Sequence, residues 1–155
     1  MKTDFDTKLE ELYIDLPEPP SNKGSTVGVT RLGKTMYVAG ATPYASGRLH
    51  HPGRVGIEIN LDKARLAART AAVLAIACAW HDLGGSLAKI RRVVHVDGFV
   101  ACGADFKDHD KALDGASDLL GEIFGPYGKH TRTAAGVASL PGGSSISLTV
   151  IFELK

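Results

Sequence analysis

Residues 61–83 form a long segment rich in alanine and leucine that contains no proline. Asn60 is a good N-cap before it, and the pair Gly84-Gly85 is a typical helix stop after it. This pattern predicts one long helix. Its apolar residues recur at helical spacing, and most are alanines, whose small side chains allow a helix to lie close to a sheet. They are Leu61, Ala64, Ala68, Ala71, Ala75 and Cys78. The segment therefore predicts a helix packed on a sheet.

The rest of the chain supplies strands and a second helix. A β-rich pair of segments encloses Gly33-Lys34 and predicts a hairpin. A second apolar stripe at helical spacing ends at Gly125-Pro126 and is formed by Leu113, Ala116, Leu120, Ile123 and Phe124. The predicted strands are residues 27–32, 35–39, 55–59, 90–102, 131–140 and 145–154, of which the last alternates most strictly.

The order β-β-β-α-β-α-β-β predicts an α/β (α+β) fold with a six-stranded mixed sheet. Two helices can cover only one face of such a sheet. The other face would carry residues too apolar to leave in water as one patch: Val93, Phe99, Ala135, Val137, Thr149 and Ile151. We therefore expect copies of the chain to associate in a closed assembly through that face.

The chain is predicted to hold one domain, because 155 residues fall within the usual range of about 100 to 200 residues per domain. Residues 1–18 have mixed charge and precede Pro19-Pro20, so we interpret them as an N-terminal arm and residues 19–155 as the domain. We expect no signal peptide and no membrane segment. Cys78 and Cys102 lack CxxC spacing, which suits reduced thiols in a cytoplasmic protein.

Residues 28–35 match the phosphate-binding pattern G-x-x-x-x-G-K-[ST] letter for letter. A working loop of this kind follows a buried strand and opens a helix, whose N-terminal amides hold the phosphate. Here residues 36–40 have a strand pattern and Pro43 follows, so the context argues against nucleotide binding. The formal net charge, 18 − 17 = +1, also disfavours non-specific binding of RNA or DNA.

The histidines and cysteines do not predict a metal site. None of them has the HExxH, CxxC or H-x3-H spacing of metal ligands, and no metal or other cofactor is expected. His95 and Asp97 lie two residues apart on one strand face. They could pair as a base and its orienting group, or as a structural hydrogen bond, which is the more common case.

Arg132 is the charged residue most suggestive of a binding site. On its predicted strand it shares a face with Ala134, Gly136 and Ala138, whose small side chains leave space over the guanidinium. A guanidinium fork can hold a carboxylate through two parallel hydrogen bonds. An interface or surface salt bridge explains the pattern equally well.

Residues 130–141, His-Thr-Arg-Thr-Ala-Ala-Gly-Val-Ala-Ser-Leu-Pro, resemble the signature of the Rid family (YjgF type) of reactive-intermediate deaminases. The preceding Asp-Gly-Ala-Ser-Asp at residues 114–118 is similar to the Asn-Gly-Ala-Ser-Asp of one subgroup. Residues 37–40 and 93–100 are similar to two further strands of the family. The resemblance covers about residues 19–154.

This resemblance implies a chorismate-mutase-like fold and a homotrimer with ligand clefts between subunits. Active members hydrolyse enamine or imine intermediates to a keto acid and ammonia, so the expected partner is a small carboxylate or imine. Arg132 matches the carboxylate clamp, and Asp114, His130 or a backbone carbonyl could activate the water. Some members carry an endoribonuclease label, which the net charge of +1 does not favour.

Other positions depart from the family pattern. Ser147 stands where deaminases have a Glu associated with the attacking water, and Ala39 replaces the Ser before Gly40. Thr26 aligns with an early Tyr, and Asp114 with an Asn. Two functions remain open at this point. The chain is either an imine or enamine hydrolase or a trimer that binds a small carboxylate without turnover, using Arg132 and amides near Gly40.

Overall fold

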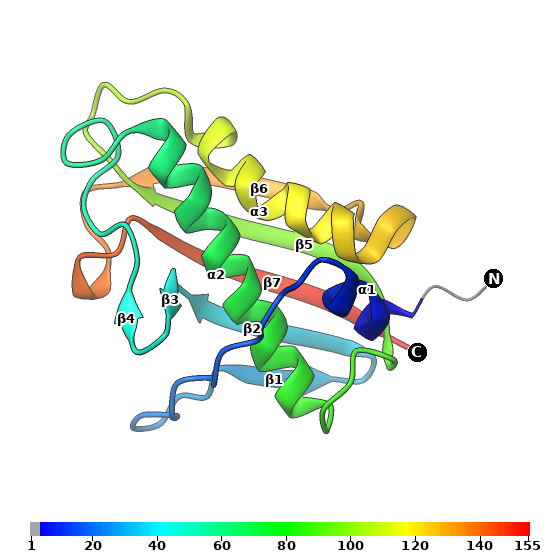
Figure 1. Cartoon of the computed structure of the whole chain (residues 1–155). Helices are drawn as coiled ribbons and strands as arrows, with labels where there is room; N and C mark the ends of the chain where they lie inside the picture. Colours follow the sequence, from blue (N-terminus) through cyan, green and yellow to red (C-terminus); the bar gives the residue numbers. More distant parts are fainter. Residues whose placement is uncertain (1–3) are drawn as a thin grey trace.

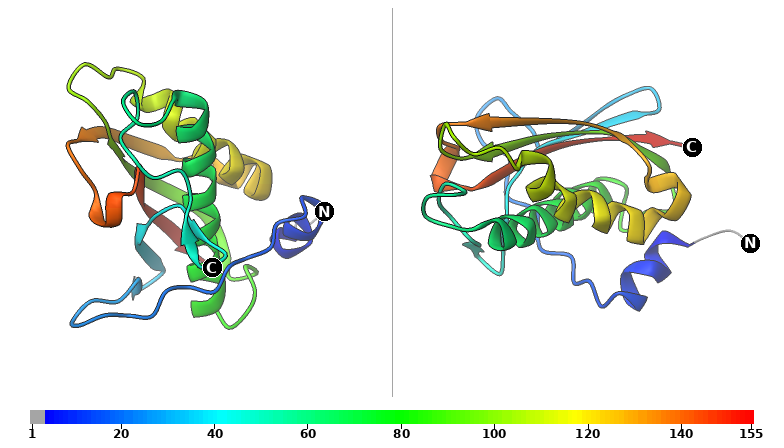
Figure 2. Two further views of the ribbon diagram at one scale, coloured as in Figure 1. Left: turned by 60° about the vertical axis from the view of Figure 1, so that its left-hand side comes forward. Right: turned by 90° about the horizontal axis from the view of Figure 1, so that it is seen from above.

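The computed structural model describes residues 4–155 and has a mixed α+β architecture. One sheet has the strand order β1-β2-β7-β5-β6, and two long helices cover one of its faces (Figures 1 and 2). The helices are α1 (Phe5–Glu11), α2 (Leu61–Asp82) and α3 (His109–Phe124), with 3₁₀ turns η1 (Gly125–Gly128) and η2 (Pro141–Gly143). The strands are β1 (Val29–Leu32), β2 (Thr35–Ala41), β3 (Tyr44–Ala45), β4 (Arg48–Leu49), β5 (Ile90–Ala101), β6 (Thr131–Val137) and β7 (Ile146–Leu154).

Helices α2 and α3 lie side by side on the sheet, as the alanine pattern predicted. The side chain of Asn60 accepts a hydrogen bond from the amide of Lys63 at 2.9 Å and caps α2. The two helices meet closely at Gly115, where a Cβ atom would lie 2.0 Å from the carbonyl oxygen of Arg65. The glycine of the Gly-Ala-Ser-Asp segment is therefore a packing residue.

Strand β7 lies at the centre of the sheet, antiparallel to both β2 and β5. Its alternation places Ile146, Leu148, Val150, Phe152 and Leu154 under the helices. Strand β6 is an edge strand and runs parallel to β5, with α3 as the crossover between them. The mixed sheet that the sequence predicted is thus confirmed.

The predicted strand at residues 55–59 is wrong, and the main sheet has five strands rather than six. Residues 55–59 form a turn in which the carbonyl of Arg54 accepts from the amides of Ile57 and Glu58. Gly53 and Gly56, at φ +114° and +84°, bend the backbone away from an extended course. Strands β3 and β4 form a separate hairpin that the sequence did not reveal, since each has only two residues.

The predicted hairpin around Gly33-Lys34 is confirmed as β1 and β2. Its turn glycine has φ +58°, which suits a tight hairpin. The residues that match the phosphate-binding pattern therefore lie in two paired strands and do not open a helix.

Helix α1, at the start of the expected N-terminal arm, packs on the core. Phe5 and Leu9 are buried, and the Phe5 ring meets that of Phe124 edge-on at 4.8 Å. The carboxylate of Asp6 accepts from the hydroxyl of Ser86 and the amide of Leu87, which ties α1 to the loop after α2. The first part of the expected arm thus contributes apolar surface to the core.

The sheet face opposite the helices is uncovered in one copy of the chain (Figure 2). Tyr37 and Phe99 are each 39% exposed there, and the strand register aligns Tyr37, Ile151 and His95 in one row. Within residues 4–155, none of the helices combines the length and apolar character that crossing a membrane requires.

Candidate functional site

Arg132 on β6 points to the face covered by helices and meets the first half of α3. Its Nη1 donates to Asp114 Oδ1 and to Ser117 Oγ, both at 3.0 Å. Its Nη2 donates to the carbonyl oxygen and to Oδ1 of Asp110, both at 3.2 Å. The Arg132 side chain is only 18% exposed, whereas that of Asp110 is 80% exposed. The guanidinium is therefore paired with one carboxylate that is largely exposed to solvent, Asp110, and with one that is less exposed, Asp114.

His130 extends this network at the start of β6. Its Nδ1 lies 2.6 Å from the carbonyl oxygen of Gly128, and its Nε2 lies 2.9 Å from Ser117 Oγ. A carbonyl oxygen can only accept, so Nδ1 carries the proton. In the neutral ring Nε2 is then the acceptor, and the Ser117 hydroxyl donates to it. Gly128 is required here because a Cβ atom would lie 2.4 Å from the Leu120 carbonyl oxygen.

These side chains border an open hollow of about 660 Å³. Its polar lining residues are Asp110, Ser117, Lys129, His130 and Arg132. Three glycines of α3 and η1, Gly121, Gly125 and Gly128, also line it and have no side chains that would fill it. With Asp114 behind Arg132, the hollow has two formal negative and two formal positive charges beside it. Such a surface suits a ligand that carries both signs of charge.

The structure brings together Arg132, His130 and Asp114, the residues proposed from the sequence for catalysis. It adds Asp110 and Ser117, which the sequence analysis did not select. A signal for both was present, because residues 110, 114 and 117 follow the i, i+4, i+7 spacing of one helix face. Their contact with Arg132 depends on how α3 crosses β6.

The other residues proposed for ligand binding lie elsewhere in the chain. Ala39 and Gly40 are at a bulge of β2, with Gly40 at φ +71°, and border a separate hollow of about 490 Å³. Thr26 precedes β1, and its hydroxyl donates to the Lys23 carbonyl at 3.1 Å. Ser147 pairs with Phe99 across the uncovered face of the sheet, opposite to the face of Arg132. Within one chain, these residues do not meet the Arg132 cluster.

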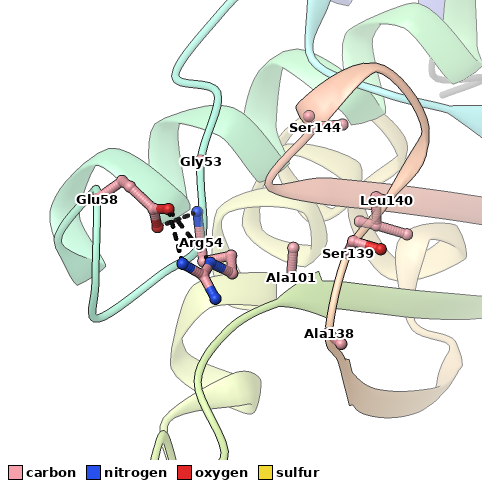
Figure 3. A pocket seen from close by; sticks show the side chains of 9 residues that line it. Gly53, Arg54, Glu58, Ala101, Ala138, Ser139, Leu140 and Ser144 are labelled. Atoms are coloured by element: carbon pink, nitrogen blue, oxygen red, sulfur yellow. Dashed lines mark hydrogen bonds and ion pairs between the residues drawn. The ribbon is translucent and has the colours of Figure 1, made fainter.

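A third hollow, of about 330 Å³, lies at the carboxyl ends of β5 and β6 (Figure 3). Arg54 lies at its edge, but the Arg54 guanidinium already donates two hydrogen bonds, of 3.1 and 3.2 Å, to the Glu58 carboxylate. The same hydrogen bonds hold the pKa of the Glu58 carboxyl below its ordinary value. The remaining lining includes Ala101, Ala138 and Leu140, so this hollow offers little to polarise a substrate.

Two other histidine contacts lie apart from the Arg132 cluster. His95 Nε2 is 2.8 Å from Asp97 Oδ1, and His95 Nδ1 is 2.7 Å from Thr131 Oγ1, so the expected pair exists on the uncovered face. Cys102 Sγ lies 3.5 Å from His109 Nε2. Burial raises the pKa of the Cys102 thiol, which therefore stays protonated near neutral pH.

Candidate metal ligands are dispersed in the described part of the chain. Residues 4–155 contain no group of three or more His, Cys, Asp or Glu side chains placed to hold an ion.

Comparison with known proteins points to one family. The family model "YjgF/chorismate mutase-like, putative endoribonuclease" matches residues 6–154. Protein TCP17 of Trypanosoma cruzi is 30% identical over 148 residues, covering 95% of this chain and 92% of that protein. A crystal structure of a protein of unknown function from Agrobacterium tumefaciens is 35% identical with a TM-score of 0.91, covering 97% of this chain and 92% of that one.

Further solved structures agree in fold. A "putative endoribonuclease" from Shewanella oneidensis is 30% identical with a TM-score of 0.92, covering 97% of this chain and 99% of that one. The YjgF protein of Escherichia coli is 18% identical with a TM-score of 0.64, covering 89% and 94%, and shows likeness of fold alone. The expected chorismate-mutase-like fold is thus confirmed, and with the match over residues 6–154 the chain belongs to the YjgF family.

Proposed function

We propose that the chain hydrolyses 2-imino acids, or the enamines from which they form, to 2-keto acids and ammonia. The observation that carries this proposal is the state of Arg132: a largely buried guanidinium at a hollow, held on Nη1 by Asp114 and Ser117 and covered on Nη2 by the exposed side chain of Asp110. Solvent screens the Asp110 carboxylate, which is 80% exposed, so a substrate carboxylate can displace this side chain from Arg132.

Displacement of the Asp110 side chain frees one hydrogen of Nη2, while the other still donates to the Asp110 carbonyl oxygen. The Nε–H of Arg132 has no acceptor within residues 4–155, and Nη2 lies beside it on the same edge. These two groups form the fork that binds a planar carboxylate with two parallel hydrogen bonds. Asp114 and Ser117 stay on Nη1 and keep the guanidinium oriented.

The charge balance of the hollow indicates the form of the substrate. A protonated 2-imino acid is a zwitterion, with a carboxylate for Arg132 and a cationic imine nitrogen that the Asp114 carboxylate attracts. A protonated imine is already electrophilic, so water needs only modest activation. RNA is a poorer match, because phosphate binding calls for an excess of cations and the formal charges here cancel.

The trimer expected from the sequence would complete the site from a second copy. Ser147 lies on the uncovered face, where an adjoining copy would pack, and Ala39 lies at the bulge of β2. We therefore propose that a neighbouring subunit packs along the edge strand β6 and brings its Ser147 and its β2 bulge, with the Gly40 amides, to the Arg132 hollow.

Binding without turnover is the second candidate function. Ser147 and Ala39 favour it, because a hydroxyl and a methyl group stand where hydrolysing relatives of the Rid type have a carboxylate and a hydroxyl. The Arg132 fork would still bind a small carboxylate in such a protein.

The two candidates are separated by measuring ammonia and keto-acid release from 2-imino acids generated enzymatically in the assay. We expect hydrolysis above the uncatalysed rate with the wild type, and loss of at least about tenfold in kcat/KM with Arg132→Ala, since a charge-assisted fork contributes about 1.5–3 kcal/mol. The matched control is Arg54→Ala, which also removes an ion-paired arginine but at another hollow. If no imine is hydrolysed while 2-keto acids bind in calorimetry, the binding function replaces the enzymatic one.

A further inference from the structure

We propose that Ser117 and His130 form a proton relay that serves the attacking water at the Arg132 hollow. This inference rests on the proposed imine hydrolysis and assigns the acid and base steps to particular atoms. Ser117 would contact the water, and His130 would hold the transferred proton behind it.

The hydrogen bonds around Ser117 all run in one direction. Arg132 Nη1 donates to Ser117 Oγ at 3.0 Å, and the Ser117 hydroxyl donates to His130 Nε2 at 2.9 Å. His130 Nδ1 donates to the Gly128 carbonyl at 2.6 Å, which fixes the ring and its tautomer. The Arg132 charge next to Ser117 Oγ also favours negative charge developing on that oxygen.

Asp114, the other candidate for acid-base catalysis, is already bound to Arg132. Asp114 Oδ1 accepts from Arg132 Nη1 at 3.0 Å, so this carboxylate already orients the guanidinium. Ser117 and His130, in contrast, both line the hollow into which the carboxylate fork of Arg132 opens. Ser117 lies at Nη1, on the side of the guanidinium away from the fork, and shares the hollow with it, so the relay would serve a water that reaches the imine carbon from the Nη1 side.

The relay accounts for every proton in the reaction. The water oxygen bonds to the imine carbon as the C=N π pair moves to nitrogen. A water proton passes to Ser117 Oγ while the Ser117 proton passes to His130 Nε2. His130 and Ser117 then return one proton to the nitrogen of the carbinolamine. The C–N bond breaks, ammonia leaves and takes the remaining hydroxyl proton, and the products are the 2-keto acid and ammonium.

The test compares wild type with Ser117→Ala, Ser117→Thr and His130→Ala in the imine assay. General acid-base catalysis contributes about 10²- to 10⁴-fold, so we expect Ser117→Ala and His130→Ala to lower kcat by about 100-fold or more. KM should change less than kcat, because Asp114 still holds Nη1 and the Nε and Nη2 fork of Arg132 keeps its groups. Ser117→Thr keeps the hydroxyl and should retain most of the activity.

Chemical rescue separates a relay from a structural role. Added imidazole should restore kcat to His130→Ala, because the hollow is open, but not to the double variant His130→Ala/Ser117→Ala. If wild type hydrolyses imines and Ser117→Ala keeps its kcat, the relay is overturned while the proposed function stands. If wild type hydrolyses no imine, the proposed function fails and the relay fails with it.

A measurement without substrate tests the direction of the hydrogen bonds. We expect ¹H–¹⁵N NMR of the wild type, assigned by comparison with His130→Ala, to show neutral His130 protonated on Nδ1. Protonation on Nε2 would reverse the bond to Ser117 and overturn the relay whatever the activity.

Discussion

Single residues at close contacts determine the position of α3. Gly115 is the position where an added side chain would meet the closest neighbouring atom. Any side chain there would push α3 away from the Arg65 carbonyl of α2. Because Asp114 and Ser117 flank Gly115 in the helix, a displaced α3 would also move the groups that hold Arg132. The absence of a side chain at Gly115 thus affects both the packing of α3 on α2 and the geometry of the site.

Gly115→Ala should lower the free energy of unfolding by about 1–3 kcal/mol, the usual cost of overpacking. The control is Gly121→Ala on the same helix, where a Cβ atom meets nothing within 4 Å. That change should be neutral or stabilising by up to about 1 kcal/mol, because alanine favours helix. Urea unfolding measures both, and equal effects of the two changes would contradict the close contact.

Asp110→Ala should strengthen the binding of small carboxylates by about two- to fivefold, because the ligand no longer competes with an exposed ion pair. Calorimetric titration with 2-keto acids gives the change in Kd. Asp108→Ala is the control, since Asp108 is paired with Lys111 and not with Arg132. Weaker binding in Asp110→Ala would mean that Asp110 contacts the ligand instead of covering its site.

Among the elements, α1 shows how a short helix gains stability from tertiary contact. A seven-residue helix is too short to persist alone in water, so its order depends on Phe5 and Leu9 reaching the core. The Asp6 hydrogen bonds to Ser86 and Leu87 add a fixed orientation.

Phe5→Ala should therefore destabilise the protein by about 3 kcal/mol, as expected for a buried aromatic ring. Tyr13→Ala, at a side chain 93% exposed, should change the stability by less than about 0.5 kcal/mol. Thermal and urea unfolding provide the comparison. If Phe5→Ala were as mild as Tyr13→Ala, the packing of α1 on the core would contribute little to stability.

Elements with a strong local pattern were predictable from sequence, and those that depend on contacts were not. The α2 helix and β7 follow from periodicity alone, and the hairpin at Gly33 from its turn residues. Residues 55–59 have an apolar pattern like a strand, but flanking glycines and the Arg54 turn prevent pairing. For the site, the motif around Arg132 was found, whereas Asp110 covering its guanidinium follows only from the crossing of α3 over β6.

For the molecule as a whole, the sheet face opposite the helices is the apolar surface that a single copy of the chain does not bury. Tyr37, Phe99 and Ile151 lie on it in adjacent strands, so we predict that copies of the chain associate there. Ile151→Lys would place a charge in that contact. Light scattering should then show the mass falling from three times 16.3 kDa to 16.3 kDa.

The control for this prediction is Leu66→Lys, at an exposed leucine on α2 away from the uncovered face. It should leave the mass unchanged. A wild-type mass of 16.3 kDa would contradict association through this face. Because Ser147 lies on the same face, Ile151→Lys should also lower imine hydrolysis if a second copy completes the site.

The position of β7 in the chain determines when the sheet can be completed during synthesis. This strand joins the β1-β2 hairpin to the β5-β6 pair, yet it is the last to leave the ribosome. Until it emerges, both halves expose unpaired strand edges and helices without a completed core, the kind of surface that chaperones protect. A nascent chain that has not yet exposed β7 cannot close the main sheet, so the two halves are joined only after this strand has emerged.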